Sequence, residues 1–141
     1  MYFKPLLIPL LVQVALTFVV MIVMYRRRVT EMQTKRIHPQ RTKTRSKTLG
    51  VLTDSETSAN NYANLFESPI LFYTAILLTL ILMVQDTIVV ILAWTYAGSR
   101  CIHSFIHMTY NKVMHRFMVF LFSSFVLFAI WVRLGWIVLQ S

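Results

Sequence analysis

The stretch "NNYANLFESPILFYTAILLTLILMV", residues 60–84, begins with amides and a glutamate and ends as a nearly unbroken apolar run. The run has the length and composition of a membrane-spanning helix, which we expect at about residues 58–84. A carboxylate or an amide inside hydrocarbon costs free energy unless it is paired. The sequence therefore predicts partners for Asn60, Asn61, Asn64 and Glu67.

The chain as a whole is rich in apolar residues and in basic residues. Of its 141 residues, 57% are hydrophobic, and 14 are Lys or Arg against 5 Asp or Glu. A soluble domain is about half apolar and about a quarter charged, and it does not gather its apolar residues in long blocks. We expect one domain over residues 1–141, an all-α integral membrane protein whose other helices are at about residues 5–25, 88–108 and 114–139. The short connections make neighbours antiparallel, which is typical of a four-helix bundle.

Basic residues set the expected orientation. Nine of the fourteen lie between Arg26 and Lys47, directly after the first apolar block. That flank is typical of a helix end in the cytoplasm, so residues 26–57 are predicted to be a basic cytoplasmic loop, with both termini outside. The same distribution argues against nucleic-acid binding. A cleaved signal peptide is also disfavoured, because its positive charge would precede the apolar stretch.

Polar residues recur at helical spacing on three of the expected helices. Asn60, Asn64 and Glu67 share one face of the second helix, since they are four and three residues apart. The third helix carries Tyr96, Arg100, His103 and His107, and the fourth carries Arg116, Phe120 and Ser123. All of them lie toward the predicted cytoplasmic ends, so we expect an ion pair between Glu67 and Arg100.

Two interpretations of these stripes stay open. They form either a site for an anionic, peptide-like ligand, with Arg100 and Arg116 holding carboxylates, or a structural polar cluster that fixes helix register. No metal site is predicted, because His103 and His107 have the spacing of chelating ligands but no third ligand is in register. The single cysteine, Cys101, excludes an internal disulfide and is interpreted as a packing residue.

The segments "NNYANLFESP" and "AWTYAGSRCIHSFIHMTYNKVMHR" resemble sequences of the MAPEG family, the membrane-associated proteins of eicosanoid and glutathione metabolism. The resemblance covers about residues 58–135 and is closest to the small bacterial branch. It implies a homotrimer of four-helix subunits in a bacterial inner membrane. It also implies glutathione as the cofactor, bound near the cytoplasmic face.

Residue by residue, the resemblance predicts a site. Asn64 and Glu67 match helix-two contacts to glutathione, and Arg100, with His103 beside it, matches a helix-three contact. Arg116 fits the catalytic arginine that stabilises the glutathione thiolate. The implied function is a glutathione-dependent transferase or peroxidase acting on a lipophilic electrophile. The alternative is a non-enzymatic scaffold or lipid-binding protein, since the family includes a lipid-binding member.

Four positions depart from the pattern of the enzymes. Where the enzymes carry two arginines on helix two, this chain has Asn60 and Ala63. Where they carry tyrosines on helices three and four, it has His107 and Phe120. The predicted site therefore has fewer cations and fewer hydroxyl groups than those of the enzymes.

Overall fold

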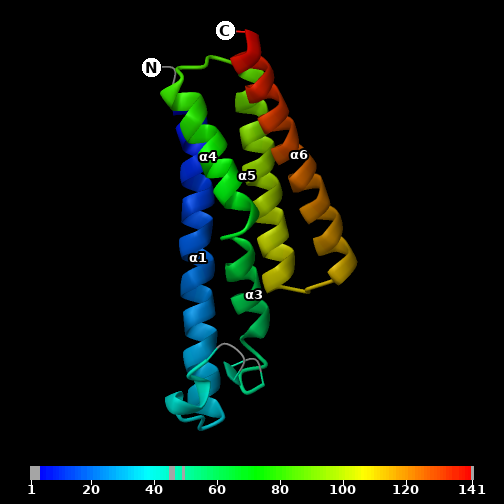
Figure 1. The fold of residues 1–141 in the computed structure, drawn as a ribbon. Coiled ribbons are helices and arrows are strands. Elements are labelled where there is room, and N and C mark those ends of the chain that lie inside the picture. Colours follow the sequence, from blue (N-terminus) through cyan, green and yellow to red (C-terminus); the bar gives the residue numbers. More distant parts are fainter. Residues whose placement is uncertain (1–3, 45–46, 49, 141) are drawn as a thin grey trace.

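The computed structural model describes residues 4–44, 47–48 and 50–140, and within these it contains helices and no strands. Helix α1 (Lys4–Thr34) is followed by the short 3-10 helix η1 (Pro39–Thr42), and then by α3 (Glu56–Asn64), α4 (Ser68–Ile81), α5 (Thr87–Met108) and α6 (Val113–Gln140). The helices form an elongated bundle with both termini at one end (Figure 1). The basic segment and the α5–α6 connection lie toward the other end (Figure 1).

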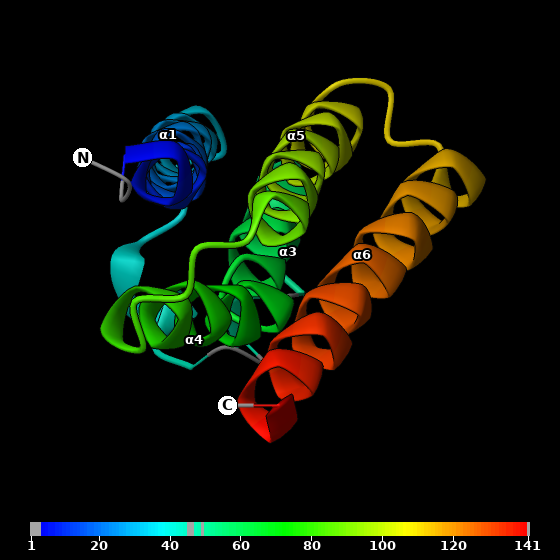
Figure 2. The same ribbon diagram turned by 90° about the horizontal axis from the view of Figure 1, so that it is seen from above.

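Four helical stretches in the described residues are long and apolar enough to cross a membrane. They are α1, the combined α3–α4 stretch Glu56–Ile81, α5 and α6. Helix α5 contacts α1, α3 and α6, so it is the central helix of the subunit (Figure 2). The predicted all-α bundle with four membrane-spanning helices is confirmed, and α5 and α6 begin and end within one residue of their predicted bounds.

The first helix is longer than predicted. Instead of ending at residue 25, α1 continues through Arg26–Arg28 to Thr34. Arginine, methionine and glutamine are good helix formers, and no proline interrupts the chain between Pro9 and Pro39. The basic segment is therefore helical at its start, and the predicted loop over residues 26–57 begins about nine residues too early.

The second helix is interrupted rather than continuous. Helix α3 ends at Asn64 and α4 begins at Ser68, with Glu67 as the N-cap residue at φ −94° and ψ −95°. Pro69 lies in the first turn of α4, and a proline there lacks the amide that a continuous helix needs and would clash with the carbonyl four residues earlier. The second membrane-spanning stretch, predicted as one helix over residues 58–84, is thus fully broken over residues 65–67.

Next to this break, a pair of aromatic side chains packs α4 against α5. Phe72 of α4 stacks on Tyr96 of α5 with a 4.5 Å centroid separation, and both side chains are fully buried. Ala75, Val89 and Ile130 complete the core around them. Tyr96 lies one helical turn before Arg100, so this core fixes where the Arg100 side chain points.

The basic end of the bundle is tied by two residues of α1. Arg27 donates hydrogen bonds to Ser58 Oγ at 2.9 Å and to the Met108 carbonyl at 3.0 Å, which joins α1 to α3 and α5. The Glu31 carboxylate accepts from the backbone amides of Asp54 and Ser55, both at 2.9 Å. Ser55 is the N-cap of α3, but its hydroxyl donates to Glu31 instead of accepting from α3.

Candidate functional site

Arg100 is the centre of the polar region. Its side chain is 0% exposed, and its Nη2 donates to the Asn64 carbonyl at 3.2 Å. The Phe120 ring lies against the guanidinium, 5.9 Å from Cζ to the ring centroid. The other nitrogens, Nε and Nη1, are buried and have no hydrogen-bond partner among the described residues. A buried cation with two unsatisfied nitrogens is costly unless something outside the subunit compensates it.

The predicted ion pair between Glu67 and Arg100 is absent. Glu67 is exposed, and the ion pairs within the described residues join Lys35 to Glu31, Lys35 to Asp54 and Arg133 to Asp86. The prediction assumed one continuous helix, in which Asn60, Asn64 and Glu67 share a face. The break over residues 65–67 changes the helical phase, so Glu67 leaves that face.

The phase of α3 itself also differs from the prediction. Asn60 is exposed, whereas its neighbour Asn61 is 0% exposed and accepts a 3.2 Å hydrogen bond from Ser104 Oγ on α5. Asn61 and Ser104 were not among the predicted site residues. The repeated asparagines at 60 and 61 could not show which of the two faces α5, because that depends on how α3 packs.

Arg116 belongs to a second polar group, formed by α5, α6 and their connection. Its Nη1 donates to Asn111 Oδ1 at 2.8 Å and lies 3.2 Å from His107 Nε2. A guanidinium has no acceptor, so His107 Nε2 must accept and the ring proton of a neutral His107 lies on Nδ1. Asn111 adopts a left-handed φ of 46° that asparagine tolerates better than most residues.

His103 links the two groups. Its ring centroid lies 5.8 Å from that of His107 and 6.0 Å from that of Phe120. Like His107, it is buried and has an unpartnered Nδ1 among the described residues. The cluster therefore runs from Asn64 on α3 through Arg100 and the histidines of α5 to Arg116 on α6.

The structure thus brings together four of the five predicted site residues and leaves Glu67 on the surface. Within the described residues, neither guanidinium of the cluster forms an ion pair with a carboxylate. The cluster is therefore cationic and suited to an anion. No group of three or more His, Cys, Asp or Glu side chains that could hold a metal ion occurs in the described part of the chain.

A sequence model of the MAPEG family matches residues 6–136. The chain therefore belongs to the MAPEG family, which its sequence was found to resemble. It is a multi-pass integral membrane protein of the superfamily that serves glutathione and eicosanoid metabolism. Searches of curated proteins and of solved structures gave no match.

Proposed function

We propose that the protein binds glutathione at this cluster and joins the glutathione sulfur to a lipophilic electrophile that arrives from the membrane, so that the whole glutathionyl group is transferred. The observation that carries the proposal is the buried guanidinium of Arg100, with Nε and Nη1 unpartnered. A tripeptide with two carboxylates supplies the missing negative charge. We assign Asn64, Glu67, Arg100 and His103 to binding, with Asn64 and Glu67 retaining exposed surface for the ligand.

Arg116 has the catalytic role in this proposal. It is partly exposed, and Asn111 and His107 hold its guanidinium in one orientation. A fixed cation beside a thiol favours the thiolate, which is the nucleophile. The thiol proton leaves to water, and the sulfur forms a bond to the electrophilic carbon as the leaving group departs. Proximity in a water-poor site supplies the rest of the acceleration.

The test is a thermal-shift titration of the purified protein in detergent with reduced glutathione, and S-hexylglutathione beside it. A ligand that binds only the folded state at 100 times its Kd stabilises it by about 2.7 kcal/mol. We expect a saturable rise in melting temperature that Arg116→Ala reduces, and loss of turnover in that variant. The control is Lys112→Ala, which removes an exposed cation one turn earlier. No shift at millimolar ligand contradicts the proposal.

A second candidate, a non-enzymatic scaffold, is favoured by a different observation. The bonds from Arg100 to the Asn64 carbonyl and from Ser104 to Asn61 join α3 to α5 inside the subunit. If these bonds are the whole purpose of the cluster, Arg100→Met lowers the melting temperature of the ligand-free protein and glutathione has no effect on either form. Stabilisation by glutathione in the parent protein excludes this alternative.

We also propose that the subunit self-associates as a homotrimer. Glu67 is exposed although it lies well inside the apolar stretch Glu56–Ile81. A carboxylate that faces lipid at that position is expensive, and such groups are normally covered by protein or by a ligand. A second copy of the chain covers Glu67 in this proposal, and the bilayer surrounds the assembly.

A further inference from the structure

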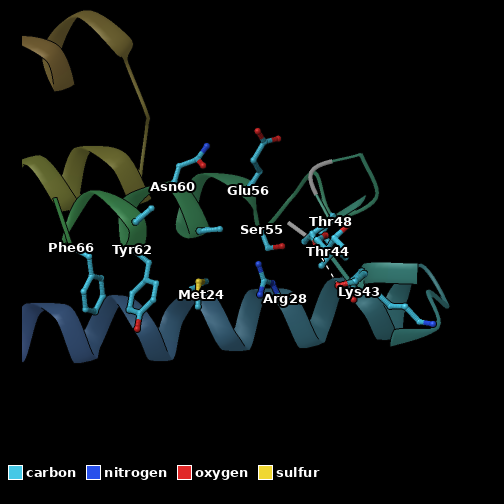
Figure 3. Close-up of a pocket in the computed structure, with 14 residues that line it drawn as sticks. Met24, Arg28, Lys43, Thr44, Thr48, Ser55, Glu56, Asn60, Tyr62 and Phe66 are labelled. Carbon is cyan, nitrogen blue, oxygen red and sulfur yellow. Dashed lines mark hydrogen bonds between the residues drawn. The ribbon is translucent and has the colours of Figure 1, made fainter. Parts of the chain in front are cut away.

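Helix α3 has two faces with different surroundings. Its buried residue Asn61 contacts α5, where the Arg100 cluster lies. Four other residues follow one another at helical spacing and line a pocket of about 500 Å³ between α3, α1 and the basic segment: Ala59, Tyr62, Ala63 and Phe66. Figure 3 shows Tyr62 and Phe66 pointing from α3 and its C-terminal end toward α1. This pocket is therefore separate from the Arg100 cluster.

The end of this pocket near the basic segment is polar and cationic. Arg28 points from α1 toward Ser55 (Figure 3), and its Nε is buried with no hydrogen-bond partner among the described residues. Lys43 also lines the pocket, and Glu56 is its one acidic lining residue. Hydroxyl groups of Thr42, Thr48 and Ser55 also line this end, and they donate to the Pro39 and Thr44 carbonyls and to Glu31. The unpartnered guanidinium nitrogen of Arg28 is therefore the donor that suits a phosphate oxygen.

The opposite end is apolar and continues along α1. A second pocket, of about 410 Å³, shares Tyr62 and Phe66 with the first. Its other lining residues come from α1, α4 and the break before α4: Leu10, Val14, Thr17, Phe18, Met21, Leu65, Tyr73 and Leu77. Phe18 and Phe66 are 57% and 51% exposed, so this part is open at the side, toward lipid. The two pockets form one groove with a cationic head end and an apolar length.

The part of the groove nearest Arg28 matches one leaflet of a bilayer in depth. At a rise of about 1.5 Å per residue, the α1 lining from Arg28 to Leu10 is about 27 Å long, and its first part, from Arg28 to Thr17, covers about 16 Å, close to half of a hydrocarbon core of about 30 Å. Arg28 stands beside Arg26 and Arg27 at the level where basic residues meet headgroups. An acyl chain that extends from Arg28 along α1 toward Thr17 therefore reaches the middle of the membrane alongside Tyr62 and Phe66.

We propose that this groove binds one anionic phospholipid, with its phosphate against Arg28 and an acyl chain between α1 and the α3–α4 pair. The lipid comes from the leaflet on the side of the basic segment. It lies between α1 and the helix break before α4. This site does not depend on glutathione binding, because it lies on the other face of α3.

The test uses the whole protein, delipidated in a neutral detergent, with native mass spectrometry and thermal shift as readouts. Dioleoyl phosphatidylglycerol is compared with dioleoyl phosphatidylcholine and with inorganic phosphate. We expect one retained phosphatidylglycerol per subunit and a saturable rise in melting temperature. Arg28→Gln weakens this binding about tenfold, the size expected for one lost charge-assisted hydrogen-bond site. The matched control Arg26→Gln removes an exposed charge outside the lining and changes affinity less than about twofold.

A second variant keeps the test decisive if Arg28→Gln does not fold. Ala59→Phe fills the groove without changing charge, and we expect it to abolish retention of phosphatidylglycerol. Equal losses in Arg26→Gln and Arg28→Gln, or full binding in Ala59→Phe, overturn the proposal in favour of non-specific attraction. Equal stabilisation by inorganic phosphate overturns it in favour of a free-anion site, and equal retention of phosphatidylcholine overturns the assignment of an anionic lipid.

Discussion

Asp86 lies directly before α5, at the end of the bundle where both termini lie. Its Oδ1 accepts from the Val89 amide at 3.0 Å, which caps the helix, and its Oδ2 accepts from Arg133 Nη2 at 2.6 Å and Nε at 3.1 Å. The hydrogen bond from Arg133 holds the pKa of the Asp86 carboxyl below its ordinary value of 3.8, although burial acts in the opposite direction. Arg133 thus joins α6 to the start of α5.

The Asp86–Arg133 pair predicts a pH-dependent stability. Because the folded pKa is lowered, the pair stabilises the protein above pH 3.8 and its contribution is lost as pH falls through the folded pKa. Asp86→Asn keeps a good N-cap and removes the charge, so we expect it to cost about 1 kcal/mol or less at neutral pH, since Arg133 is 34% exposed and solvent screens the pair. Melting curves from pH 7 to pH 3 measure the difference between the two proteins. A gap that persists unchanged at pH 3 contradicts this explanation.

At the scale of elements, the start of α3 depends on a residue of α1. Glu31 is 4% exposed, and its carboxylate accepts from two backbone amides, from Ser55 Oγ at 2.8 Å and from Lys35 Nζ at 2.6 Å. A negative charge before the first turn of a helix is favourable because the amides there lack partners. The bonds of Glu31 thus fix the position at which the basic segment ends and α3 begins.

Replacing Glu31 tests this anchor. In Glu31→Gln one carboxylate oxygen becomes an amide that faces donors, so hydrogen bonds worth about 1.5–3 kcal/mol to a charged acceptor are lost. We expect a lower melting temperature and faster hydrogen exchange at residues 54–60. The control is Glu56→Gln, since Glu56 forms no ion pair within the described residues. Equal effects of both substitutions indicate a general loss of negative charge instead of a specific anchor.

For the whole molecule, the arrangement of the helices separates two chemically different ends. Both termini lie at one end, and the segment with most of the basic residues lies at the other (Figure 1). Basic residues flanking membrane helices stay on the cytoplasmic side. We therefore propose a cytoplasmic basic segment, with the termini on the outer side of a bacterial inner membrane.

Labelling of single cysteines tests the orientation. In a Cys101→Ser background, Gln40→Cys and Gln140→Cys place thiols at two exposed positions at opposite ends of the bundle. In intact spheroplasts we expect a membrane-impermeant maleimide to label position 140 and to label position 40 only after permeabilisation. Inverted vesicles serve as the reciprocal control, and the opposite pattern refutes the orientation.

The oligomeric state is the second prediction at this scale. Native mass spectrometry in detergent is expected to give three subunits for the parent protein. Glu67→Gln lowers the detergent concentration at which the assembly dissociates, because a buried intersubunit contact of the carboxylate is lost. Glu56→Gln, outside the proposed contact, leaves the dissociation point unchanged. A monomeric parent protein contradicts the trimer.

The sequence by itself determined the number and order of the membrane-spanning stretches, the ends of α5 and α6, and the family. Long apolar runs and short connections carry this information locally, since transfer into lipid depends on composition more than on neighbours. The tertiary structure alone decided which polar residues meet. The break over residues 65–67 shifts the helical phase and leaves Glu67 exposed and outside ion-pair distance of Arg100, and the choice of Asn61 over Asn60 follows from how α3 packs on α5. Glu31 and Arg27 likewise found partners more than twenty residues away, through contacts that no local pattern encodes.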